Sequence, residues 1–150
     1  TKKINFIYIF ATMLHLKTKD LLKKSSLAIT KNRLKVLSFF LKSDKPISLK
    51  AINLEFKNFD RVTLFRILSK FEENKLIHSI ILDDAKKLFA LCKNQCNNST
   101  THNHNHVHFV CKKCDDVTCL DIDNFPILNA PNFTFNEISI NASGICSNCN

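Results

Sequence analysis

Two Cys-x-x-Cys pairs, Cys111/Cys114 and Cys146/Cys149, stand in the last quarter of this 150-residue chain. A gap of two residues lets both sulfurs of a pair point at one ion, so two pairs can complete the tetrahedral shell of Zn²⁺. Disulfides would leave the repeated spacing unexplained, and the odd total of seven cysteines also favours reduced thiols. The four cysteines therefore predict a structural zinc site.

A second set of soft ligands predicts a regulatory metal site. His106 and His108 are two residues apart on an expected strand and so point to the same face, where both imidazoles can reach one ion. Cys119 follows on the next expected strand, whereas His78 and Cys92 open and close an earlier hairpin. Each residue also fits a plain structural role, since a thiol packs well as a small hydrophobe. The expected ligands are His78, Cys92, His106, His108 and Cys119, with His104 and Asp121 as further candidates.

Charge is divided unevenly along the chain. Residues 1–91 hold nineteen Lys/Arg against eight Asp/Glu, whereas residues 92–150 hold three against five. A basic first half joined to a mildly acidic, Cys/His-rich second half indicates a nucleic-acid-binding module coupled to a metal-binding one. The alternative is a Lys-rich surface that only keeps the protein in solution.

The first half shows the pattern of a winged helix-turn-helix. We expect a short helix from Lys17 with Leu21, Leu22 and Leu27, and further helices capped by Thr30, Ser48 and Asp60. The third includes Ile47, and the last, residues 60–74, is the expected recognition helix. Residues 76–82 and 87–91 predict a hairpin that serves as the wing. The exposed face of the recognition helix offers Arg61, Thr63 and Arg66 for phosphate and base contacts.

The second half predicts a small β-rich domain pinned by its thiols. Residues 106–110, 117–122 and 133–141 alternate like strands, and the first knuckle joins the first two. We expect four segments: an N-terminal extension outside the fold (residues 1–16), a winged-helix domain (17–92), a polar loop or hinge (93–105) and a metal-binding domain (106–150). The apolar run at residues 4–11 is too short to span a bilayer.

Three motifs together resemble the ferric uptake regulator family. Residues 62–68 (VTLFRIL) resemble its recognition-helix signature A-T-V-Y-R-x-L. Residues 106–114 (HVHFVCKKC) resemble H-x-H-[FL]-x-C-x-x-C, and residues 144–149 (GICSNC) resemble the closing G-x-C-x-x-C. The motifs occur in family order and span about residues 17–149.

The resemblance implies a homodimeric, metal-dependent repressor with an N-terminal winged helix and a C-terminal α/β dimerisation domain, an α+β fold pinned by a four-cysteine zinc site. It implies that Phe65 packs on thymine methyl groups, that Arg66 contacts DNA and that Arg33 touches phosphate. Cys119 takes the family's Asp or Glu position, and His78 with Cys92 resembles a pair of the zinc-sensing branch. The family's helix between the knuckles is missing or reduced, because the stretch is short and holds Pro126 and Pro131.

Thiolate and imidazole ligands suit Zn²⁺ better than Fe²⁺ or Mn²⁺, so we expect a cytoplasmic, zinc-responsive repressor of metal-homeostasis genes that binds a palindromic operator. No small-molecule substrate, membrane contact or enzymatic activity is expected, since no His-Glu-x-x-His or comparable element occurs. Two alternatives stay open: an iron- or peroxide-responsive regulator of the same family, and a zinc-buffering or metallochaperone protein.

Overall fold

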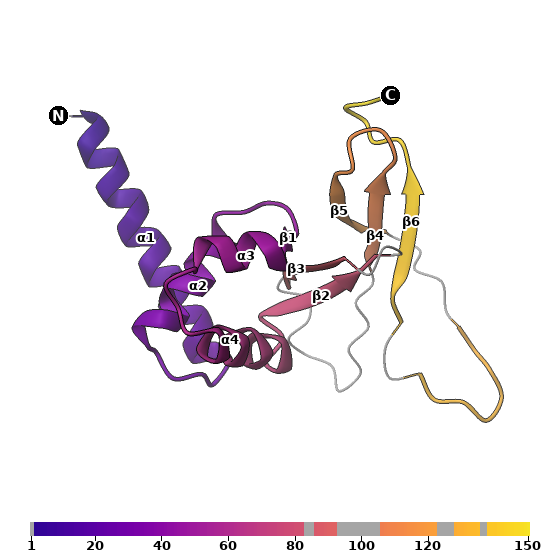
Figure 1. The fold of residues 1–150 in the computed structure, drawn as a ribbon, viewed down its shortest axis with the longest axis horizontal. Coiled ribbons are helices and arrows are strands. Elements are labelled where there is room, and N and C mark those ends of the chain that lie inside the picture. The colour runs from indigo at the N-terminus through magenta and orange to yellow at the C-terminus, as the bar shows by residue number, and fades with distance from the viewer. Residues whose placement is uncertain (1, 83–85, 93–105, 123–127, 136–137) are drawn as a thin grey trace.

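The computed structural model describes residues 2–82, 86–92, 106–122, 128–135 and 138–150, with side chains from Ile9 onward and except at His106. The described residues form four helices and a first small sheet, whose strand β1 lies between α2 and α3, and then a second small sheet. Figure 1 shows the helices at one end of the molecule, the second sheet at the other, and the hairpin β2–β3 between them. The predicted mixture of helices and sheets is confirmed.

The helices begin where the sequence supplies caps. α2 (Lys31–Leu41), α3 (Leu49–Glu55) and α4 (Arg61–Glu73) follow the N-caps Thr30, Ser48 and Asp60. Each cap side chain accepts a hydrogen bond from the backbone N–H three residues later, at 2.8–3.3 Å. The three expected N-caps are therefore confirmed.

The first helix differs from the expectation. α1 runs without a break from Lys2 to Lys24, so the helix begins well before the expected start at Lys17. That residues 1–16 form an extension outside the fold stays a prediction. The helix ends before Leu27, because Ser26 adopts a left-handed φ of 54° that stops helical hydrogen bonding. Thr18 is fully buried and shares a hydrogen bond with Ser38 of α2 at 3.2 Å, which ties the two helices together.

The first sheet has the strand order β1–β3–β2, with β1 at Ile47–Ser48, β2 at Ile77–Ile81 and β3 at Lys87–Leu91. The predicted hairpin is confirmed by antiparallel pairs from Ile77↔Leu91 to Ile81↔Lys87. The prediction that Ile47 belongs to the third helix is wrong, because Ile47 pairs with Phe89 and gives the wing a third strand.

The second sheet has the order β5–β4–β6, with β4 at His106–Cys111, β5 at Val117–Asp121 and β6 at Ile140–Gly144. β5 runs antiparallel to β4 and β6 runs parallel to it. The third strand was expected at residues 133–141, but Phe133 and Phe135 lie outside any strand and are exposed. Alternation there is not matched by a partner strand, and pairing begins only at Ile140.

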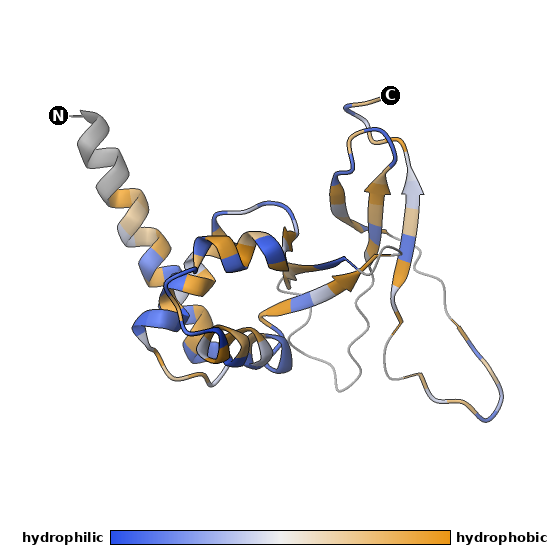
Figure 2. Ribbon diagram, viewed as in Figure 1, coloured by the Kyte–Doolittle hydropathy of each residue, from blue (hydrophilic) through white to orange (hydrophobic). Residues whose placement is uncertain are grey.

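Two apolar clusters form the core. The larger packs the helices on the first sheet and includes the fully buried Val36, Leu37 and Phe71. The smaller joins the two sheets: Ile80, Leu88 and Ala90 of the wing pack with Val117, Val110 and Cys119 of the second sheet. Figure 2 shows mostly apolar residues along β4, in keeping with a strand covered by its neighbours. The two sheets thus share one interface. No helix in the described part of the chain is long and apolar enough to cross a membrane.

Candidate metal centres and nucleic-acid interface

The four knuckle cysteines come together at the ends of β4 and β6. Because these strands are parallel and pair Cys111 with Gly144, each delivers its Cys-x-x-Cys turn at the same edge of the sheet. The four sulfur atoms lie within 4.8 Å of one another, and those of Cys114 and Cys146 are 3.8 Å apart. A tetrahedron with Zn–S bonds of about 2.3 Å has S···S edges of about 3.8 Å. The thiols therefore fit zinc in both number and spacing.

Backbone N–H groups stabilise negative charge on one sulfur of this cluster. The N–H groups of Cys146 and Lys113 point at the Cys111 sulfur, at 3.4 and 3.5 Å. These two hydrogen bonds lower the pKa of Cys111 to about 6. The neighbouring Cys146 and Cys114 thiols instead raise the pKa of Cys149 to about 12. One thiol is thus ionised near neutral pH before any metal arrives.

A second group of ligands gathers inside the interface between the two sheets. His78 comes from β2 of the wing, whereas His108 and Cys119 are register partners on β4 and β5. One ligand atom from each lies within 4.8 Å of the others, and the two imidazoles stack with centroids 5.4 Å apart. His108 is buried, with 5% of its surface exposed. The donor set of two imidazoles and one thiol suits zinc and joins the two halves of the chain.

Cys92 lies on the other side of the His78 ring. The Nε2 atom of His78 is 3.8 Å from the Cys119 sulfur, and its Nδ1 atom is 3.6 Å from the Cys92 sulfur. A single imidazole nitrogen binds a single ion, so in this ring orientation Cys92 does not share an ion with Cys119. A thiol on the second nitrogen can instead fix the tautomer and direction of a ligating ring.

Of the other expected ligands, Asp121 is not part of this cluster. Asp121 is exposed at the end of β5, where its register partner is His106. His104 and the side chain of His106 fall outside the described residues, so their predicted roles stay predictions.

The expected DNA-contacting residues lie at the start of α4 and α2. Arg61 and Arg66 are exposed and Phe65 has 70% of its surface exposed, so all three face outward. Thr63 donates its backbone N–H to the Asp60 carboxylate, which lowers the pKa of Asp60. The Arg33 guanidinium donates to the Ala28 carbonyl at 2.9 Å. Val62, which was not among the expected DNA-contacting residues, is also exposed, with 54% of its surface accessible.

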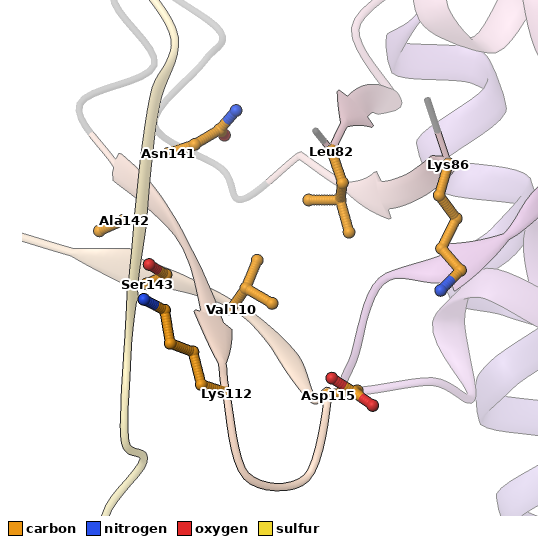
Figure 3. A pocket seen from close by; sticks show the side chains of 8 residues that line it. All are labelled: Leu82, Lys86, Val110, Lys112, Asp115, Asn141, Ala142 and Ser143. Carbon is orange, nitrogen blue, oxygen red and sulfur yellow. The ribbon is translucent and has the colours of Figure 1, made fainter. Parts of the chain in front are cut away.

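The sheet interface is incompletely filled. A cavity of about 640 Å³ separates the end of the wing hairpin from the second sheet (Figure 3), lined by Leu82, Lys86, Val110, Lys112, Asn141 and Ser143 among others. Leu82 and Lys86 belong to the wing side, and the other four belong to the sheet. The Asn141 amide crosses to the Ile81 carbonyl at 3.3 Å. Because close-packed interfaces resist deformation, this space leaves the two halves room to change their angle.

A winged helix joined through a shared metal-ligand cluster to a sheet that bears four clustered cysteines defines the class: a metal-binding regulator with a helix-turn-helix. The family model "Ferric uptake regulator family" matches residues 24–138. The Staphylococcus aureus ferric uptake regulation protein is 30% identical over 138 residues, which cover 86% of this chain and 93% of that protein. The corresponding protein of Campylobacter upsaliensis is 27% identical and covers 89% and 87%.

Solved structures show the same fold. A zinc uptake regulator complexed with zinc and DNA aligns with a TM-score of 0.63 and 19% identity, covering 92% of this chain and 93% of that one. The Vibrio cholerae ferric uptake regulator aligns at 0.55 and 21%, covering 85% and 98%. The chain belongs to the ferric uptake regulator family of metal-responsive transcription regulators.

Proposed function

We propose that this protein is a zinc-responsive transcriptional repressor that binds a palindromic operator as a homodimer and controls metal-homeostasis genes. The observation that carries the proposal is the cluster of His78, His108 and Cys119, because its ligands come from both halves of the chain. An ion held there ties the wing to the second sheet. Soft thiolate with imidazole favours Zn²⁺ over Fe²⁺ or Mn²⁺.

The four-cysteine cluster serves a different purpose in this account. All four of its ligands belong to the second sheet and its two knuckles, so zinc there holds that domain together. The knuckles leave no place for a substrate once four sulfurs bind the ion, as expected for a structural site.

The mechanism is a two-state hinge. His78 on the wing and His108 and Cys119 on the second sheet would hold an ion that fixes the angle between each winged helix and that sheet. The two recognition helices of a dimer would then enter successive major grooves. Loss of metal frees the wing to move over the partly open interface, and the helix spacing no longer matches the operator. A decisive shift of such an equilibrium requires about 5 kcal/mol of differential metal affinity, which a zinc site can supply.

DNA contact is assigned to the exposed start of α4. Arg61 and Arg66 supply guanidinium groups for phosphate and guanine, and Thr63 supplies a hydroxyl. Phe65 and its neighbour Val62 supply apolar contacts to thymine methyl groups. Arg33, near the start of α2, adds a phosphate contact.

Operator binding during metal titration tests this function. Protein that keeps one structural zinc per chain is mixed with palindromic AT-rich DNA from its own promoter region, and Zn²⁺, Fe²⁺ or Mn²⁺ is added. Restoration of tight binding by Zn²⁺ at the lowest free concentration is expected, and His108→Ala removes the response. Restoration by Fe²⁺ or Mn²⁺ alone contradicts zinc sensing, and DNA binding indifferent to every metal contradicts the repressor mechanism.

A further inference from the structure

A salt bridge links the two halves at a point separate from the junction ligands. The Lys45 Nζ atom lies 2.6 Å from Oδ2 of Asp116, although 71 residues separate them in sequence. Lys45 belongs to the loop between α2 and β1, and Asp116 follows the first cysteine knuckle. The pair therefore joins the DNA-binding half to the knuckle end of the second sheet.

The lysine end of this bridge is anchored in the wing. The Ser43 hydroxyl donates to the Lys45 carbonyl at 2.8 Å and accepts from its N–H at 3.3 Å, which fixes the loop. The ring of Pro46 fixes its own φ, and Ile47 then enters β1 beside Phe89 of β3. A displacement of Lys45 is therefore transmitted through β1 to the first sheet, which carries His78.

The aspartate end is part of the metal knuckle. The Asp116 carbonyl accepts from the Cys111 N–H at 2.9 Å, and its own N–H hydrogen-bonds to the Cys114 sulfur. Asp115 between them holds a left-handed φ of 57°, which closes the turn tightly. The position of Asp116 consequently depends on where the two cysteines are held.

Charge adds to this geometry. Besides Asp116, the sulfurs of Cys114 and Cys146 lie close enough to attract the Lys45 ammonium. Four thiolates around one Zn²⁺ would carry a net charge of −2, which would add to the attraction between Asp116 and the Lys45 ammonium.

We propose that Lys45 and Asp116 form a second link, through which the four-cysteine cluster positions the winged helix for operator binding. The link rests on the proposed DNA-binding function and deepens it, because it gives the structural zinc site a share in orienting the recognition helix. Lys45 and Asp116 act as positioning residues and touch no DNA themselves.

Replacing an acid by its amide separates this role from general electrostatics. Loss of a negative charge should strengthen binding to the DNA polyanion, yet Asp116→Asn is expected to weaken operator binding about two- to fivefold, since the orienting pair is lost. The matched control is Asp115→Asn, which removes the same charge one residue away and keeps a residue that tolerates φ 57°. Zinc content and thermal unfolding are measured on both, so that loss of the knuckle is recognised.

The lysine side provides an independent test, because its side chain is 62% exposed and its removal leaves the fold intact. Lys45→Gln should weaken operator binding by the same factor as Asp116→Asn. The slope of the logarithm of the binding constant against the logarithm of the salt concentration should not change. Lys45→Arg should restore binding, and Lys45→Gln combined with Asp116→Asn should be no worse than either alone. A slope smaller by about 0.9 would instead show that Lys45 contacts a phosphate directly.

Two failures are distinguishable. If Asp116→Asn and Asp115→Asn bind the operator equally well, while the unaltered protein binds it tightly, the Lys45–Asp116 link is refuted and the repressor function stands. If the unaltered protein binds no operator with any metal, the proposed function itself is refuted.

Discussion

Cys119 puts a sulfur atom 3.8 Å from a ring nitrogen of His78, at the seam between the two halves of the chain. In the proposed function the preference of the junction for zinc rests on this atom, because a thiolate ligand favours zinc whereas a carboxylate in its place suits iron or manganese. Spacing and residue type predicted the grouping of the four knuckle cysteines, whereas His78, His108 and Cys119 are the three of the expected junction ligands that the structure brings together. The sequence motifs could not show that Cys92 faces the opposite nitrogen of His78, since ring orientation is decided by three-dimensional packing.

Replacing Cys119 by the carboxylate tests this assignment. Cys119→Asp should lower the zinc affinity of the second site by about tenfold or more, and should let Fe²⁺ or Mn²⁺ restore operator binding at lower concentration. Chelator competition and DNA titration measure the two effects. Cys92→Ser is the matched control and should keep the zinc preference; an equal loss in both variants would contradict the ligand assignment.

Proton release on zinc binding reports on the Cys111 thiol. Its pKa near 6 is below the usual value, so Cys111 is already a thiolate at pH 7 and takes up a proton only as the pH falls through 6. Zinc should therefore displace about 0.9 of a proton from this residue at pH 5 but about 0.1 at pH 7. Calorimetry of His108→Ala protein in buffers of different ionisation enthalpy isolates the four-cysteine site. A proton count that does not fall between these pH values would rule out the ionised thiol.

At the scale of elements, the capped helices and the hairpin could be predicted because the signals are local. Thr30, Ser48 and Asp60 each satisfy a backbone N–H one turn ahead, and alternation between two turn-bounded runs defines the wing. The two-residue β1 and the start of β6 could not be predicted in this way. Each exists only because a strand distant in sequence, β3 or β4, offers hydrogen-bond partners.

Substitutions at two adjacent residues of α4 should distinguish an effect on operator binding from an effect on stability. Phe65 is 70% exposed whereas Leu64 is only 4% exposed, so the first side chain faces solvent and the second packs in the core. Phe65→Ala should cost about 1 kcal/mol of operator binding and leave unfolding unchanged. Leu64→Ala should lower the free energy of unfolding by about 2–5 kcal/mol, as urea denaturation would show. Full operator affinity in Phe65→Ala would remove this side chain from the proposed DNA interface.

At the scale of the whole molecule, function depends on the contact between two small sheets. The apolar cluster of Ile80 and Val117 packs the sheets together, and it includes the junction ligand Cys119. The cavity of about 640 Å³ lies at the end of the wing hairpin. In the proposed mechanism this interface changes its angle when the junction site fills. Such a partly packed contact is what a hinge requires, because a few kcal/mol of metal binding can then choose the angle.

The distance between the two recognition helices of the dimer tests this account most directly. Spin labels attached through a non-cysteine chemistry at Lys70, which is exposed on α4, leave both thiol clusters intact. With zinc in the four-cysteine site, pulsed electron resonance should show a broad distance distribution that narrows when the junction site fills, and His108→Ala should stay broad. An identical distribution with and without junction metal would contradict the hinge.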